Sequence, residues 1–100
     1  MEHAVISHDV LAAYAADAAR GVDGVVGLVD GPRRHRGVRV TEGDRAFTLE
    51  VHVAVGWGSR IPELGGAVQR RVAEYVRRTA KVPAVTVDVV IAGVGTPGDH

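Results

Sequence analysis

Residues 47–55 constrain the fold more than any other segment, because apolar and mostly polar side chains alternate through them without interruption. A two-residue period places successive side chains on opposite faces of a β-strand, so one face is apolar and the other is largely polar. Residues 85–92 alternate in a similar way. We therefore expect two strands of a sheet that is covered on one face and open on the other.

Two further segments have the helical period that is needed to cover such a sheet. Residues 7–20 start at Ser7, whose hydroxyl predicts an N-cap, and end before Gly21. Residues 60–80 carry a single apolar stripe, and basic side chains gather near their end. The predicted buried stripes are Val10, Leu11, Tyr14 and Ala18 in the first helix and Ile61, Leu64, Val68, Val72, Tyr75 and Val76 in the second.

The order of the predicted elements indicates the fold class. Residues 22–30 and 38–41 are rich in Val and predict two more strands, separated by a loop with Gly and Pro at 31–37. The order is therefore helix, strand, strand, strand, helix, strand. We predict an α+β fold of two layers, with both helices packed on one face of a small mixed, mostly antiparallel sheet. The second helix is expected to connect two parallel strands.

The composition limits the chain to one domain and excludes several function classes. The chain has 100 residues, 46% of them apolar, and its 12 basic residues balance its 12 acidic ones, so no net charge attracts nucleic acid or anionic lipid. It has no Cys, which excludes disulfides, thiol catalysis and thiolate metal sites. The first 20 residues lack the pattern of a secretory signal, so we expect a cytoplasmic protein. We expect a single domain over residues 1–100, with a core at about 6–94 and a flexible tail at 95–100.

The residue types that carry catalysis, metals or cofactors form no recognised pattern. Ser7 and Ser59 are the only serines, and both are placed to cap helices. Glu50 and His52 share one strand face, but two ligands about 7 Å apart along a strand do not close a metal site. The glycine-rich segments lack the Lys and Ser or Thr of a phosphate loop. We predict no catalytic, cofactor-binding or metal-binding residues.

Open-face side chains, a basic loop and a tryptophan make up a candidate interaction surface. Trp57 lies between two glycines, where it either anchors a partner or folds back over the start of the second helix. The basic loop at Arg33–Arg36 suggests an alternative function, an RNA-binding module, although no aromatic side chain accompanies it and the net charge is zero. The candidate residues are Trp57, Glu50, His52, Arg33, Arg34 and Arg36.

The chain contains five short motifs, AARGVDGV at 18–25, VAVGWG at 53–58, IPEL at 61–64, VQRRV at 68–72 and VTVDVVIAGV at 85–94. In their order and span, these motifs resemble the alkaline shock protein family of bacterial envelope stress response proteins. They are structural motifs rather than catalytic ones. The resemblance extends from about Ile6 to Val94, which is nearly the whole chain.

This resemblance implies a non-enzymatic protein of envelope stress or envelope homeostasis. It implies a homo-oligomer without a small-molecule substrate or cofactor, lying in the cytoplasm and, through a membrane-anchor protein partner, at the inner face of the cell membrane. Two positions depart from the family pattern. Ala80 and Lys81 stand in a turn that usually has Gly after Thr79, and Trp57 stands where a smaller or acidic residue is usual.

Overall fold

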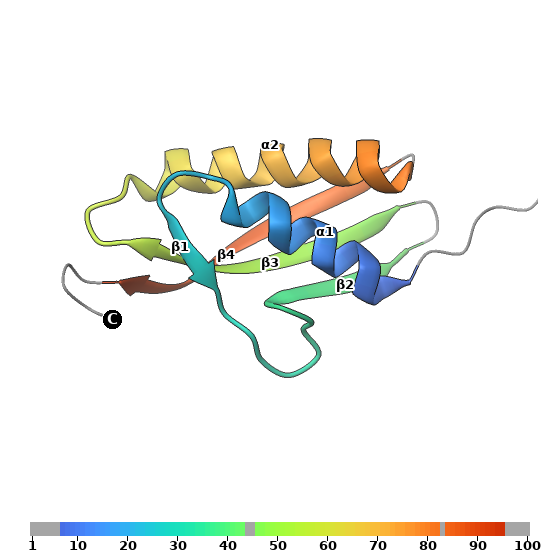
Figure 1. Cartoon of the computed structure of the whole chain (residues 1–100), viewed down its shortest axis with the longest axis horizontal. Coiled ribbons are helices and arrows are strands. Elements are labelled where there is room, and N and C mark those ends of the chain that lie inside the picture. Colours follow the sequence, from blue (N-terminus) through green and yellow to red (C-terminus); the bar gives the residue numbers. More distant parts are fainter. Residues whose placement is uncertain (1–6, 44–45, 83, 96–100) are drawn as a thin grey trace, which may run out of the picture.

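The computed structural model describes residues 7–43, 46–82 and 84–95, and Figure 1 shows two helices lying against one side of a sheet. The elements follow the predicted order. They are α1 (His8–Arg20), β1 (Val25–Leu28), β2 (Val38–Glu42), β3 (Phe47–Gly56), α2 (Ile61–Ala80) and β4 (Val85–Gly95). The predicted α+β fold with a mixed sheet is confirmed.

β3 is the central strand of the sheet. β4 pairs with it in parallel along its whole length, from Phe47 opposite Val85 to Gly56 opposite Gly95. Because β4 occupies one edge of β3, β1 and β2 share the other edge, where both pair antiparallel. β2 pairs with the first half of β3 and β1 with its end, so the two short strands follow one another along the same edge (Figure 1). The predicted parallel connection through α2 is therefore confirmed.

The hydrophobic core lies between the helices and one face of this sheet. Alternate residues of β3 are fully buried, as the two-residue period predicts, and α2 contributes one buried residue per turn. The α1 contribution consists mostly of alanines, whose small side chains let the helix lie close to its neighbours. The buried core residues are Leu11, Ala12, Ala15, Ala16, Ala18, Ala19, Val38, Leu49, Val51, Val53, Val55, Leu64, Val68, Val72, Val76, Val82 and Val87.

Two residues of the predicted stripes are exposed, and Tyr14 and Tyr75 are half-buried. Val10 is 40% exposed. At 100° per residue its side chain points almost opposite to that of Ala12, and Ala12 lies near the middle of the buried side of α1. Ile61 is 41% exposed. Ile61 points along the buried stripe of α2 but is the first residue of that helix, one turn before Leu64, the first buried residue.

One predicted helix cap and one predicted boundary are also wrong. Ser7 caps α1 by accepting a hydrogen bond from the Asp9 amide, but Ser59 does not cap α2. The cap position is Arg60, which makes no side-chain capping bond, because Ser59 belongs to the preceding turn, where its amide donates to the carbonyl of Gly56. The predicted tail begins too early, since β4 extends through Gly95 by pairing with the end of β3. Residues 96–100 lie outside the described part of the chain.

The turn after α2 shows the consequence of one departure from the family pattern. Lys81 ends the helix with a left-handed backbone, at φ 58°. Glycine adopts this conformation without steric cost, whereas a residue with a side chain does so less readily. The chain therefore keeps the turn that a glycine would favour.

Candidate interaction surface

The uncovered face of the sheet carries charged side chains from three adjacent strands. In the register of the sheet, Arg39 of β2 lies opposite Glu50 of β3, and Glu50 lies beside Asp88 of β4. These three residues form a row of positive, negative and negative charge across the sheet. Arg39 and Asp88 are exposed and Glu50 is partly exposed. We call this side of the sheet the open face.

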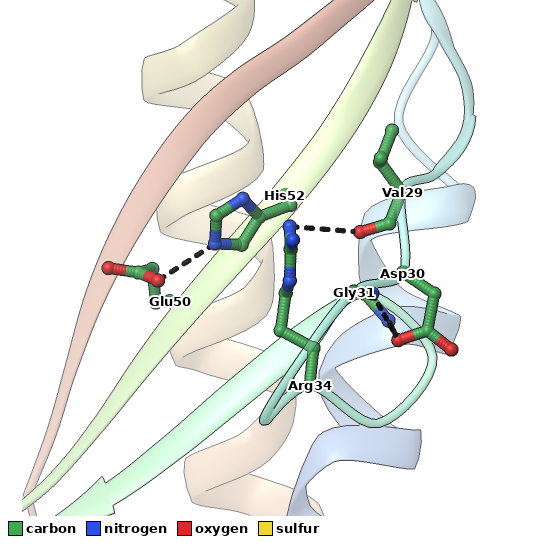
Figure 2. Close-up of polar contacts among 7 residues, drawn as sticks. Val29, Asp30, Gly31, Arg34, Glu50 and His52 are labelled. Carbon is green, nitrogen blue, oxygen red and sulfur yellow. Dashed lines mark hydrogen bonds and ion pairs between the residues drawn. The ribbon is translucent and has the colours of Figure 1, made fainter.

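Glu50 and His52 contact each other on the open face, as their shared strand face predicts. His52 Nε2 lies 2.8 Å from Glu50 Oε1 (Figure 2). This hydrogen bond holds the pKa of the Glu50 carboxyl below its ordinary value of 4.5, against a smaller opposing effect of burial. The positive charges of Arg39 and Arg34 lower the pKa of the Glu50 carboxyl in the same direction. Glu50 is therefore ionised and held in place at neutral pH.

The basic loop connects β1 to β2, and both of its ends are hydrogen-bonded to the backbone of His52. The Val29 amide donates to the carbonyl of His52 at 2.9 Å, and the His52 amide donates to the carbonyl of Gly37 at 2.9 Å. Both bonds are made by the same residue of β3, which lies between the part of β3 that pairs with β2 and the part that pairs with β1. We call residues 29–37 the arginine loop. It projects from the edge of the sheet in Figure 1.

Internal hydrogen bonds give the arginine loop a defined shape. Asp30 Oδ1 accepts from the amides of Gly31 and Gly37, at 2.9 and 3.3 Å, and so joins the two ends of the loop. Arg34 Nη1 donates to the carbonyl of Val29 at 3.2 Å, and Figure 2 shows its guanidinium folded back toward His52. The neighbouring Arg33 and Arg36 have φ angles of 63° and 56°. Of the three arginines, Arg34 is half-buried, while Arg33 and Arg36 are exposed.

Trp57 belongs to a different part of the surface. It follows β3 in the turn before α2 and is 67% exposed, so it does not fold back into the core. Four residues of β3 lie between it and His52, which at the rise of an extended strand is a span of roughly 15 Å. Val26 and Val94, at the same end of the sheet, are also exposed. The structure therefore brings together Glu50, His52 and Arg34 but places Trp57 elsewhere.

Sequence reasoning missed Arg39 as a member of the charged row. Its position could have been inferred from alternation in β2, where Val38 and Val40 point toward the helices and Arg39 points the other way. The pairing of β2 with β3 then decides that Arg39 stands opposite Glu50, and this register is not contained in either strand alone.

The arrangement makes no recognised catalytic or metal centre in the part of the chain that is described. Within residues 7–43, 46–82 and 84–95, no three His, Asp or Glu side chains gather closely enough to hold a metal ion. Neither helix in these ranges is long and apolar enough to cross a bilayer. The described open-face residues include no Phe, Tyr or Trp, and the imidazole of His52, which contacts Glu50, is the one aromatic ring among them. Charge pairing with another macromolecule is the chemistry that this surface offers.

Comparison with known proteins identifies a family and a shared fold. A family model described as the Asp23 family, with a cell envelope-related function, matches residues 1–96. No curated protein sequence matches the chain. A solved structure named "MamM CTD - Copper form" is similar with a TM-score of 0.65 and 19% identity, covering 93% of this chain and 91% of that one. The structure "MamM CTD D249N" gives a TM-score of 0.60 and 20% identity, covering 90% and 100%. At this identity the likeness concerns the fold alone.

Proposed function

The chain belongs to the Asp23 family, and we propose that it is a non-enzymatic scaffold protein of the envelope stress response. In this proposal the protein lies in the cytoplasm, associates with itself, and is held at the inner face of the cell membrane by a partner protein. The family description supports a role related to the cell envelope. The self-association, the membrane partner and the absence of catalysis are our proposals.

The open face is the observation that carries this proposal. Both helices lie on the other side of the sheet, and none of the described elements covers the row formed by Arg39, Glu50 and Asp88. Charged rows of mixed sign confer specificity on protein contacts, because a partner must present the complementary order of charges. A scaffold needs such a surface, whereas an enzyme needs a pocket with converging reactive groups.

The arginine loop and Trp57 extend the proposed contact surface beyond the row. Arg33 and Arg36 are exposed on a loop whose shape is fixed by Asp30, so a partner would meet them without first ordering the loop. Trp57 presents a large, rigid side chain to solvent. The candidate contact residues are Trp57, Glu50, His52, Arg33, Arg34 and Arg36.

Flotation with membrane vesicles tests the proposed attachment. The purified full chain is mixed with native membrane vesicles, with protease-treated native vesicles, and with vesicles of pure anionic lipid. We expect it to float with the native vesicles only, because zero net charge gives no general attraction to anionic lipid. Equal flotation with pure lipid would contradict a protein partner, and no flotation with any vesicle would contradict membrane attachment.

RNA binding is the alternative function, and the same preparation tests it. Arg33 and Arg36 are exposed, but Arg34 is turned back onto the carbonyl of Val29, so the loop presents fewer charges than its sequence suggests. We expect no mobility shift of single-stranded RNA at low salt. A shift that weakens with salt and is lost in the double variant Arg33→Ala/Arg36→Ala would favour RNA binding over the scaffold role.

A further inference from the structure

β4 presents an outer edge that pairs with no strand among the described residues. Its other edge pairs with β3, where the Phe47 amide donates to the carbonyl of Ala84 at 3.3 Å. Since backbone groups alternate in direction along a strand, those of Thr86 and Asp88 also point toward β3. The backbone groups of the odd-numbered residues, Val85 and Val87 among them, therefore point outward. The Val87 carbonyl agrees with this direction, because it accepts a hydrogen bond from a side chain of α2.

This outer edge lacks most of the devices that prevent strands from pairing with other molecules. Exposed edges are commonly blocked by Lys, Pro, short strand length or a bulge. β4 is 11 residues long, and its segment from Val85 to Ile91 contains no Lys and no Pro. Its pairing with β3 shifts between Ile91 and Gly93, which marks a bulge at Ala92. The regular part of the edge, Val85–Ile91, is thus available for pairing.

A groove with charged walls runs beside this edge. It lies between α2 and the start of β4, has a volume of about 550 Å³, and includes the small side chain of Ala73 in its lining. Gln69 Nε2 donates to the Val87 carbonyl at 2.8 Å, which satisfies one lone pair of this oxygen and leaves a second. Arg70, Glu74 and Arg77 line the groove and are exposed.

We propose that a second copy of this chain pairs with β4 edge to edge, antiparallel, about a two-fold axis at Val87. This inference rests on the proposed self-association and assigns it to one surface. In this register Val87 lies opposite Val87 of the second copy, and both have outward-pointing amides and carbonyls. Thr86 lies opposite Asp88 of the second copy, so a hydroxyl meets a carboxylate. A register centred on Asp88 is excluded, because it would place two carboxylates directly opposite each other.

The charges on α2 complement themselves about the same axis. Because β3 and β4 are parallel, α2 runs in the direction opposite to β4 and brings Arg70 and Glu74 to the level of Val85–Val87. A two-fold axis there brings Arg70 of one copy toward Glu74 of the other, and the reverse pair forms by symmetry. Within its own helix Glu74 also lies 3.3 Å from Arg78, in an exposed ion pair that contributes little, so the cross-dimer pair would share this carboxylate. A partner of different sequence would need this charge order by coincidence, whereas a second copy has it by symmetry. The paired segment is short, so the dimer is expected to be weak.

Charge reversal on α2 tests this dimer. The variants Arg70→Glu and Glu74→Arg each replace two attractive cross-dimer pairs with two repulsive ones, and we expect dimer dissociation constants raised about tenfold. The double variant Arg70→Glu/Glu74→Arg restores the complementary order and should recover the wild-type constant. Arg71→Glu is the matched control, because Arg71 makes the same charge change on the side of α2 that faces Gly21. Sedimentation equilibrium of the full chain measures all five proteins, with circular dichroism melting as the folding check.

Amide exchange provides a test that needs no substitution. The amides of Val85, Val87 and Val89 point outward, so they should exchange fast in dilute protein and slow down as concentration rises. The amides of Thr86 and Asp88, bonded to β3, should show no such dependence. Protection that does not change with concentration while the wild type dimerises would exclude this edge.

The outcomes separate this inference from the proposed function. Loss of association in both single variants with recovery in the double variant supports β4 pairing. If the wild type and all the variants associate equally well, the contact lies elsewhere. That result overturns the assignment to the β4 edge and leaves self-association intact. A wild type that stays monomeric at every concentration contradicts both.

Discussion

On β3, Leu49, Val51 and Val53 are fully buried beneath the helices, whereas Glu50 and His52 between them remain partly exposed on the opposite face. The same strand therefore builds two environments with a two-residue period. The covered face contains no buried polar or charged residue within the described chain, and the open face holds a row of charges.

Stability and recognition therefore depend on opposite faces of this sheet. Burial of apolar surface stabilises the chain on the covered side, at roughly 25 cal/mol for each Å² removed from water. Exposed charges on the open side contribute little to folding because water screens them. Substitutions on the two faces should therefore have separable effects, large on stability in one case and small in the other.

The largest expected effect comes from breaking the covered face. Leu49→Ala removes a fully buried side chain from the centre of the sheet, and the resulting cavity should lower the free energy of unfolding by about 3 kcal/mol. Thr48→Ala, one residue away on the open face, should change the free energy of unfolding by less than about 0.5 kcal/mol. Urea denaturation followed by circular dichroism measures both. Similar losses in the two variants would contradict the division between the faces.

A pair of glycines sharpens the same comparison at the turns. Gly24 and Gly58 both have positive φ, 100° and 88°. A Cβ at Gly24 would lie 3.1 Å from the Cδ2 of Leu64 on the covered side, whereas a Cβ at Gly58 would meet nothing within 4 Å. Gly58→Ala should cost about 1 kcal/mol from backbone strain alone, and Gly24→Ala about 2–3 kcal/mol because crowding adds to strain.

Thermal melting measures the loss of stability in each of the two glycine variants. The difference between the two losses gives the cost of crowding between a Cβ at position 24 and Leu64. Equal costs would show that the turn before β1 can move away from Leu64, and that the covered side is less tightly packed at its end than at Leu49.

The smallest expected effect lies on the open face and depends on pH. The pKa of Glu50 is lowered in the folded state, so its ionised form stabilises the fold above pH 4.5, and this contribution is lost as pH falls through the folded pKa. Glu50→Gln should therefore cost at most about 0.5 kcal/mol at pH 7, since the side chain is partly exposed. The cost should shrink as pH falls below 4.5 and should disappear once pH lies below the lowered pKa of the Glu50 carboxyl in the folded state. A difference in melting temperature that does not shrink as pH falls to 3 would assign the effect to packing instead.

Local patterns in the sequence determine much of this fold. The two-residue period of β3 and the helical period of α2 predict which side chains are buried, because each element has one apolar side. Val10 is apolar but exposed, because the alanines of α1 rather than its larger apolar residues define the buried side of this helix. The consecutive pairing of β1 and β2 on one edge of β3 depends on long-range register, which no single segment encodes.

The candidate surface was predictable only where alternation alone decides it. Glu50 and His52 are two residues apart on one strand, so their contact follows from the strand itself. Arg34 joins them because the loop is bracketed at His52 by hydrogen bonds to Val29 and Gly37, which are tertiary contacts. The outward direction of the β4 edge likewise required the pairing with β3.

The most direct test of contact between the open face and the envelope compares two variants, Arg39→Glu and Arg71→Glu. The measurement is the fraction of each variant that floats with native membrane vesicles. Both variants reverse one exposed arginine, the first on the open face and the second on the helical side. We predict that Arg39→Glu lowers the floated fraction about tenfold while Arg71→Glu leaves it unchanged, with similar melting temperatures for both. Equal retention of the two variants would contradict the account.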